Sequence, residues 1–318
     1  MTPFKSGLLF LLVILVSVGV SLLLTLVMLW GGFFELPLTA NVIFSELLVF
    51  IPTLLFACFS RADVMEVFRL RKVKIRTLLL TVIFVICLLP LTAALNSLTT
   101  LFSSNAGMEI GAEMMDEPHS LLEMLLVFAL FGPLCEELAF RGVIYAGLRR
   151  SGRILAAIVI QGLMFGCMHL NINQMAYGAA VGIAFGLLAE ATGSIWPSFL
   201  GHAMINGSSV IMAYQMSDEL SAGGMDIPRE TLLIIFVVYA ILAIFFTALA
   251  ILMLVVIARC EEGGEDRLKY MLHYRDLQVV GSDGGIYAVK RPHAVTVPTV
   301  IALVIAFVVM CIPIFVKI

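Results

Sequence analysis

The feature of this 318-residue chain that most constrains its fold is a series of long apolar runs, several close to the length of a bilayer crossing. Residues 7–30 contain no charged side chain, and about 20 apolar residues are enough for a helix to span the hydrocarbon core. Hydrophobic residues make up 61% of the chain and charged residues 13%, whereas soluble domains are about 25% charged. The chain is therefore predicted to be an integral membrane protein.

We predict an all-α fold, a polytopic transmembrane helix bundle with about nine spans. The predicted spans are residues 7–30, 41–60, 77–95, 121–145, 154–169, 174–189, 195–214, 232–257 and 294–316. The fifth and sixth runs are short for a complete crossing. The first run is longer than the apolar part of a signal peptide and has no clear cleavage site, so we expect it to be retained.

The basic residues predict the orientation of the bundle. With the N-terminus inside, the N-terminal segment and the loops after spans two, four and eight hold 16 of the 19 Lys and Arg residues. The acidic segments 109–117 and 218–226 then fall on the opposite side. Because short cytoplasmic loops are enriched in Lys and Arg, we predict a multi-pass protein of the cell membrane with a cytoplasmic N-terminus.

Three further segments have recognisable patterns. The basic loop 61–76, with interleaved apolar residues, is typical of a juxtamembrane anchor on anionic lipid. Segment 259–293 is predicted to be a cytoplasmic insertion containing a β-hairpin, because two β-prone runs flank the glycine-rich residues 281–285. In span six a stripe of small residues predicts close helix packing, and it consists of Gly178, Gly182 and Gly186.

These segments divide the chain into three parts. Residues 1–119 form the N-terminal helices with a basic cytoplasmic loop, residues 120–215 a membrane core, and residues 216–318 two further spans that flank the insertion. The net charge of −3 gives no indication of a nucleic-acid partner. The six cysteines show no paired spacing, so neither a disulfide framework nor a zinc site is predicted.

The candidate functional residues are polar groups inside the predicted spans. An ionisable side chain at bilayer depth costs about 2.5–3.5 kcal/mol on the insertion scale, so such residues usually face a partner or a cavity and serve function. Spans four, five and seven contain Glu136, Glu137, Arg141, His169, His202 and Asn206.

The spacing of these residues suggests how they group. Glu137 and Arg141 are four residues apart, so they share a helical face and can neutralise each other. Glu136 points about 100° away and is the freer carboxylate. His202 and Asn206 also share one face. A carboxylate with an imidazole can deprotonate a water, and a second imidazole with an amide can donate hydrogen bonds to an oxyanion.

Three motifs in this order resemble the CAAX prenyl protease and bacteriocin-processing (Abi, or CPBP) family of intramembrane glutamic endopeptidases. They are Glu-Glu-x-x-x-Arg, Phe-x-x-x-His and His-x-x-x-Asn, and the resemblance covers about residues 121–210. It implies a membrane core with catalytic residues Glu136, His169, His202 and Asn206, supported structurally by Glu137, Arg141 and Phe165. It implies neither a metal nor a cofactor.

The predicted function is therefore that of an intramembrane endopeptidase, whose water is activated by glutamate and histidine. Its expected partners are the bilayer and a membrane-associated or prenylated peptide or protein, which it would cut near the C-terminus. The alternatives are a zinc site built from the two Glu and two His, a catalytically inactive scaffold or immunity protein, and a proton-coupled transporter. The chain lacks His-Glu-x-x-His, has no aspartate in any predicted span and shows no internal repeat.

Overall fold

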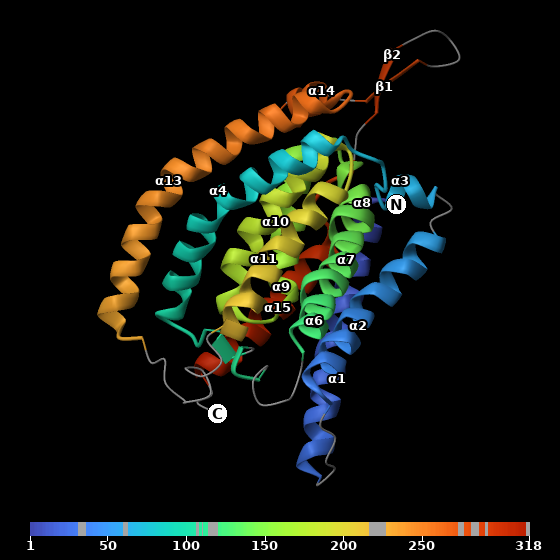
Figure 1. Cartoon of the computed structure of the whole chain (residues 1–318). Coiled ribbons are helices and arrows are strands. Elements are labelled where there is room, and N and C mark those ends of the chain that lie inside the picture. Colours follow the sequence, from blue (N-terminus) through green and yellow to red (C-terminus); the bar gives the residue numbers. More distant parts are fainter. Residues whose placement is uncertain are drawn as a thin grey trace.

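The computed structural model describes residues 1–30, 36–59, 63–105, 108–109, 111–113, 120–215, 227–272, 277–280, 286–289 and 292–315. It is a bundle of long helices, with two short strands projecting from one end (Figure 1). The predicted acidic segment 218–226 and the glycine-rich turn 281–285 lie outside the described residues.

The elements follow one another in this order along the chain. They are α1 (Pro3–Leu29), α2 (Leu38–Phe59), α3 (Val64–Val67), α4 (Ile75–Thr100), α6 (Leu121–Met124), η1 (Leu125–Phe131), α7 (Gly132–Glu137), η2 (Leu138–Ile144), α8 (Tyr145–Arg149), α9 (Ile154–Met168), α10 (Ile172–Thr192), α11 (Trp196–Gln215), α13 (Arg229–Cys260), α14 (Gly264–Met271), β1 (Leu277–Val280), β2 (Ile286–Val289) and α15 (Val297–Phe315).

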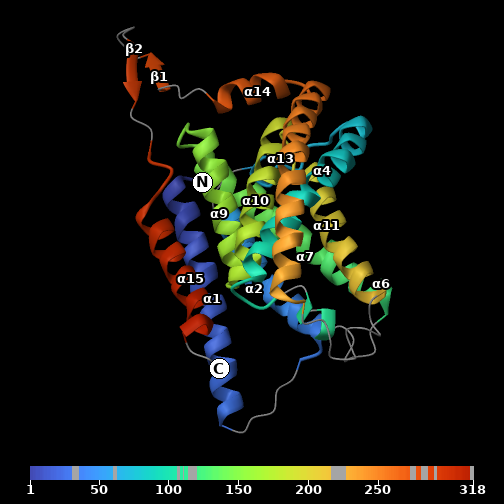
Figure 2. The same ribbon diagram turned by 90° about the vertical axis from the view of Figure 1, so that its left-hand side faces the viewer.

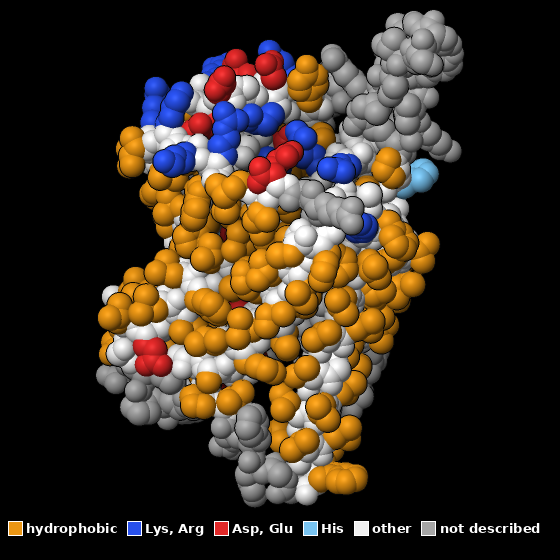
Figure 3. Space-filling view, turned by 90° about the vertical axis from the view of Figure 1, so that its right-hand side faces the viewer, with side chains coloured by type: hydrophobic (Ala, Val, Ile, Leu, Met, Phe, Trp, Pro, Cys, Tyr) orange, Lys and Arg blue, Asp and Glu red, His pale blue; other side chains and the backbone are white. Residues whose placement is uncertain are grey.

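Five of the described helices are long and apolar enough to cross a membrane, namely α1, α2, α4, α10 and α13. Helices α9 and α15 are apolar but shorter. Figure 3 shows hydrophobic side chains over most of the face in view, with Lys and Arg gathered beyond them at one end. A polytopic helical membrane protein agrees with these features, and the count of nine spans stays a prediction.

The two ends of the bundle differ. Figure 1 shows the N-terminus, α3, α14 and the strands toward one end, and Figure 2 shows α15 running toward the other. Strands β1 and β2 pair antiparallel, with Leu277 opposite Val289 and Val280 opposite Ile286. Which end faces the cytoplasm, and so the side on which this insertion lies, stays a prediction.

The helix that carries Glu136 is regular only in part. From residue 121 to residue 149 it is continuous, but the π-helical stretches η1 and η2 enclose the single α-helical segment α7. Pro133 stands at the junction of η1 and α7. Because proline lacks an N–H and crowds the preceding turn, a change in helix type at this point accommodates it. Such π-helical interruptions occur frequently at functional sites.

Helices α9 and α10 approach each other through glycines. A Cβ atom on Gly182 would lie 2.8 Å from the Cα of Gly162 and 3.2 Å from Cδ1 of Phe165, which is too close for a methyl group. A Cβ on Gly178 would lie 3.3 Å from the Cα of Gly166. The predicted glycine stripe therefore serves close packing, and it brings the Phe165 end of α9 against α10.

The basic segment before α4 is docked into the protein rather than simply spread on lipid. Phe68 is buried, and the Arg69 side chain is only 10% exposed. Arg69 lies 3.3 Å from the buried Glu190, which also accepts hydrogen bonds from Tyr145 and Arg149. Arg69 is thus held by a residue of α10, more than a hundred positions away, and the role of the rest of the segment as a lipid anchor stays a prediction.

Candidate active site

The two adjacent glutamates stand at the end of α7 and are both buried. Glu137 lies 2.9 Å from the Nη1 atom of Arg141, and both side chains are fully buried. The ion pair predicted from their spacing is therefore present. The Arg141 guanidinium lies 4.3 Å from the centroid of the Phe165 ring, a distance at which a cation is attracted to an aromatic face. Arg141 also donates a hydrogen bond to the carbonyl of Gly182.

Glu137 has a second partner that spacing along one helix could not reveal. The Nδ1 atom of His202, on α11, lies 3.1 Å from the same carboxylate oxygen that faces Arg141. Glu137 therefore joins α7, η2 and α11. Because a carboxylate accepts hydrogen bonds, it fixes Nδ1 of His202 as the protonated nitrogen.

Glu136 faces two imidazole rings. Its Oε2 atom lies 3.3 Å from Nε2 of His202, and its Oε1 atom lies 3.8 Å from Nε2 of His169. Nδ1 of His169 donates to the carbonyl of Phe165 at 3.0 Å, so this ring too is held from behind. Both rings thus turn their Nε2 edges toward one carboxylate.

Phe165 packs between these groups. Its ring centroid lies 5.3 Å from that of His169 and 5.6 Å from that of His202, and both contacts are edge-to-face. One face of Phe165 contacts Arg141 as well. Phe165 thus contacts both imidazoles and the guanidinium, and its supporting role stays a prediction.

Asn206 lies one turn after His202 on α11, but its hydrogen-bond partner in the structure is not one of the two glutamates. Its amide nitrogen donates to the carbonyl of Phe128, in the π-helical stretch η1, at 3.1 Å. A carboxamide has two N–H donors, so one bond to the backbone still leaves a second. The structure thus joins Glu136, Glu137, Arg141, Phe165, His169 and His202 in one cluster, with Asn206 anchored to η1.

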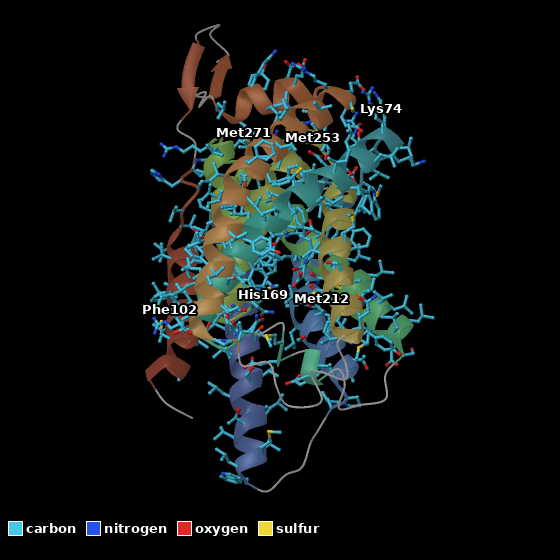
Figure 4. The ribbon with its side chains drawn as sticks, turned by 60° about the vertical axis from the view of Figure 1, so that its left-hand side comes forward. Lys74, Phe102, His169, Met212, Met253 and Met271 are labelled. Atoms are coloured by element: carbon cyan, nitrogen blue, oxygen red, sulfur yellow. The ribbon has the colours of Figure 1, made fainter. Side chains whose placement is uncertain are left out.

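The cluster lies among the apolar side chains of the bundle. Figure 4 shows His169 well away from Lys74, which marks the basic end. Among the described residues there is no group of three or more His, Cys, Asp or Glu side chains arranged to hold a metal ion. The arrangement can supply a carboxylate as a proton acceptor, two imidazoles and an amide.

One residue of this neighbourhood did not emerge from the sequence. Glu46, on α2, lies against Gly132 at the start of α7, and its Oε2 atom is buried. The signal was available, since Glu46 is the single charged residue of the predicted span 41–60. It belongs to no motif, however, and nothing in the sequence related α2 to α7.

Comparisons with known proteins find matches to the region of the chain that contains this cluster. Residues 118–208 match the family described as "Type II CAAX prenyl endopeptidase Rce1-like", and this range contains all seven predicted site residues. The protein named "Putative membrane peptidase YdiL" of Bacillus subtilis (strain 168) is 32% identical over 89 residues. That alignment covers 28% of this chain and 36% of the relative. No solved structure matches this chain.

The matched segment is thus similar to a family described as a prenyl endopeptidase and to a protein named as a membrane peptidase. The resemblance to the CAAX prenyl protease and bacteriocin-processing family is confirmed for the segment that carries the three motifs. The remaining helices, including α1, α2 and α13, lie outside the matched segment.

Proposed function

We propose that this chain is an intramembrane endopeptidase that hydrolyses a peptide bond with a water activated by Glu136. The observation that carries the proposal is the pair of imidazoles facing one buried carboxylate, at 3.3 Å and 3.8 Å. Such a set can move protons to and from a water without a covalent nucleophile.

The first step assigns Glu136 and His169. The 3.8 Å between their facing atoms is longer than a hydrogen bond, and a water that bridges them fits this separation. Glu136 takes a proton from that water while the hydroxide oxygen bonds to the carbonyl carbon of the substrate. His169 orients the water, because its ring is itself oriented by the Phe165 carbonyl.

The second step assigns His202 and Asn206 to the oxyanion. His202 presents Nε2 to the oxyanion, and Glu137 behind the ring holds its Nδ1 atom at 3.1 Å. Asn206 contributes its second N–H. The tetrahedral intermediate then collapses, the C–N bond breaks, and Glu136 returns its proton to the leaving amine. The products are a carboxylic acid and an amine, and Glu137 and Arg141 only support the geometry.

The substrate proposed is a membrane-associated peptide or protein. The matched family is described as a prenyl endopeptidase, so a peptide with a prenylated C-terminal CAAX sequence is the first substrate to test. The protein would act in the cell membrane with its N-terminus in the cytoplasm.

The test is peptide cleavage by the full-length protein, purified in detergent, with prenylated and unprenylated peptides side by side. Glu136→Gln keeps the size of the side chain and removes the base, so we expect loss of cleavage. Glu230→Gln, at an exposed position of α13, is the matched control and should cleave normally. Retained cleavage by Glu136→Gln would overturn the assignment. Loss of wild-type cleavage on adding a chelator, with rescue by zinc, would favour the metal alternative.

A further inference from the structure

Glu46 is a third carboxyl group beside the site, outside the segment that matches the endopeptidase family. It is the single charged residue of α2, and its buried Oε2 atom has no hydrogen-bond partner among the described residues. Ionisable residues inside membrane spans are costly and usually functional. Polar groups that merely join helices are hydrogen-bonded, so an unpaired buried oxygen requires another explanation.

The position of Glu46 relates it to Glu136. A Cβ atom on Gly132 would lie 3.5 Å from Oε1 of Glu46, so the carboxyl group rests on the first residue of α7. Gly132 and Glu136 are four residues apart, on one helical face and about 6 Å apart along the axis.

The charges around Glu46 give it no counter-ion. The helices that contact α2 are α1, α3, α6, η1, α7 and η2. Their ionisable side chains are Lys5, Glu66, Glu123, Cys135, Glu136, Glu137 and Arg141, and Glu123 accepts a hydrogen bond from Thr39 of α2. Lys5 and Glu66 belong to the basic end of the bundle, where the N-terminus and α3 lie (Figure 1). Arg141 is engaged by Glu137, and His202 and His169 face Glu136.

A carboxylate without a counter-ion is strongly unfavourable in an apolar environment, and one that lies close to a second carboxylate commonly retains a proton. We infer that Glu46 is a positioning residue for Glu136, and that the two carboxyl groups hold one proton between them. In this proposal Glu46 keeps the proton while Glu136 accepts the proton of the water. The effect on catalysis rests on the proposed function, whereas the shared proton does not.

The shared proton is tested by infrared spectroscopy of the purified full-length protein at neutral pH. A protonated carboxylic acid has a C=O stretching band that is separate from the bands of a carboxylate. The spectrum of Glu46→Gln subtracted from that of the wild type should contain this band, and the same subtraction with Glu230→Gln should not. In Glu136→Gln the band should shift or disappear, because the partner carboxylate is gone. A wild type without the band, or a band unchanged by Glu136→Gln, would refute the inference.

The effect on the reaction is tested by the pH profile of kcat. Glu46→Gln should displace the acidic limb by about one pH unit while KM stays the same, because the charge next to the base has changed. If Glu46 has a purely structural role, Glu46→Gln should lower the amount of folded protein and leave the acidic limb of the pH profile unchanged. That result would refute the positioning role. If the wild type cleaves no peptide, the proposed function fails, and the infrared measurement still decides whether the proton is shared.

Discussion

Removing the guanidinium of Arg141 should destabilise the protein more than any exposed ion-pair substitution. Both members of the Glu137–Arg141 pair are fully buried, at a separation of 2.9 Å. In Arg141→Ala the carboxylate of Glu137 remains buried with its main cation gone. Breaking a buried pair from one side costs about 3–5 kcal/mol, and losing the contact with the Phe165 ring adds about 1–2 kcal/mol.

The chain contains a matched control for this effect. Arg259 and Glu265 form an ion pair of nearly the same length, 2.8 Å, but their side chains are 64% and 52% exposed. Exposed pairs contribute about 0–1 kcal/mol, so Arg259→Ala should change stability little. The two variants thus remove the same chemical group at the same distance, and differ in burial.

The assay is a denaturant titration of the detergent-purified variants, followed by the loss of helical circular dichroism. Glu137→Gln combined with Arg141→Ala should be more stable than Arg141→Ala alone, because no buried charge is then left unpaired. Arg141→Ala should also lose cleavage, since Glu137 would no longer hold His202 in place. If Arg141→Ala unfolds at the same denaturant concentration as Arg259→Ala, the reasoning from burial is wrong.

Three other predictions concern packing, catalysis and topology. In the same titration Gly182→Ala should lower the free energy of unfolding by about 1–3 kcal/mol, because the added methyl group meets α9. The control Gly19→Ala has nothing within 4 Å of the added methyl group and should be neutral or stabilising. Equal effects of the two variants would contradict the packing argument. Asn206→Ala should lower kcat by about a hundredfold or more with a small change in KM, if its second N–H serves the oxyanion, and an unchanged kcat would remove it from that role. For topology, Lys72→Cys and Glu230→Cys are made separately in a chain whose native cysteines are replaced. In intact cells an impermeant thiol reagent should label the cysteine at position 230 and not the one at position 72. Equal labelling of both would refute the predicted orientation.

Local patterns in the sequence were sufficient for those features that depend on one helix at a time. The long apolar runs predicted a helical membrane protein because only internally hydrogen-bonded segments are stable in lipid. The four-residue spacing predicted the pair of Glu137 with Arg141, since residues at that spacing share a face wherever the helix ends up. The three motifs could be recognised for the same reason, because the residues of each motif lie within about one helical turn, whereas the chemistry inferred from them stays a prediction.

The relations between helices were decided by the tertiary structure. The contact of His202 with Glu137 joins residues 65 positions apart, and Arg69 reaches Glu190 across 121 positions. Neither contact has a local signal, because the depth and rotation of one helix against another depend on how their surfaces fit. At the interface of α9 and α10 that fit is set by glycines that admit no side chain.

Glu46 shows most clearly where the sequence alone was insufficient. As one carboxylate in an apolar run, it could be recognised as costly, but its purpose depended on the helix that packs beside it. The structure places Glu46 against Gly132, one turn before Glu136. Among the described residues the arginine near this point is Arg141, and it is already paired with Glu137. Composition and spacing therefore determined the class of protein and the chemical groups available to it, whereas the packing of separate helices determined which of those groups meet.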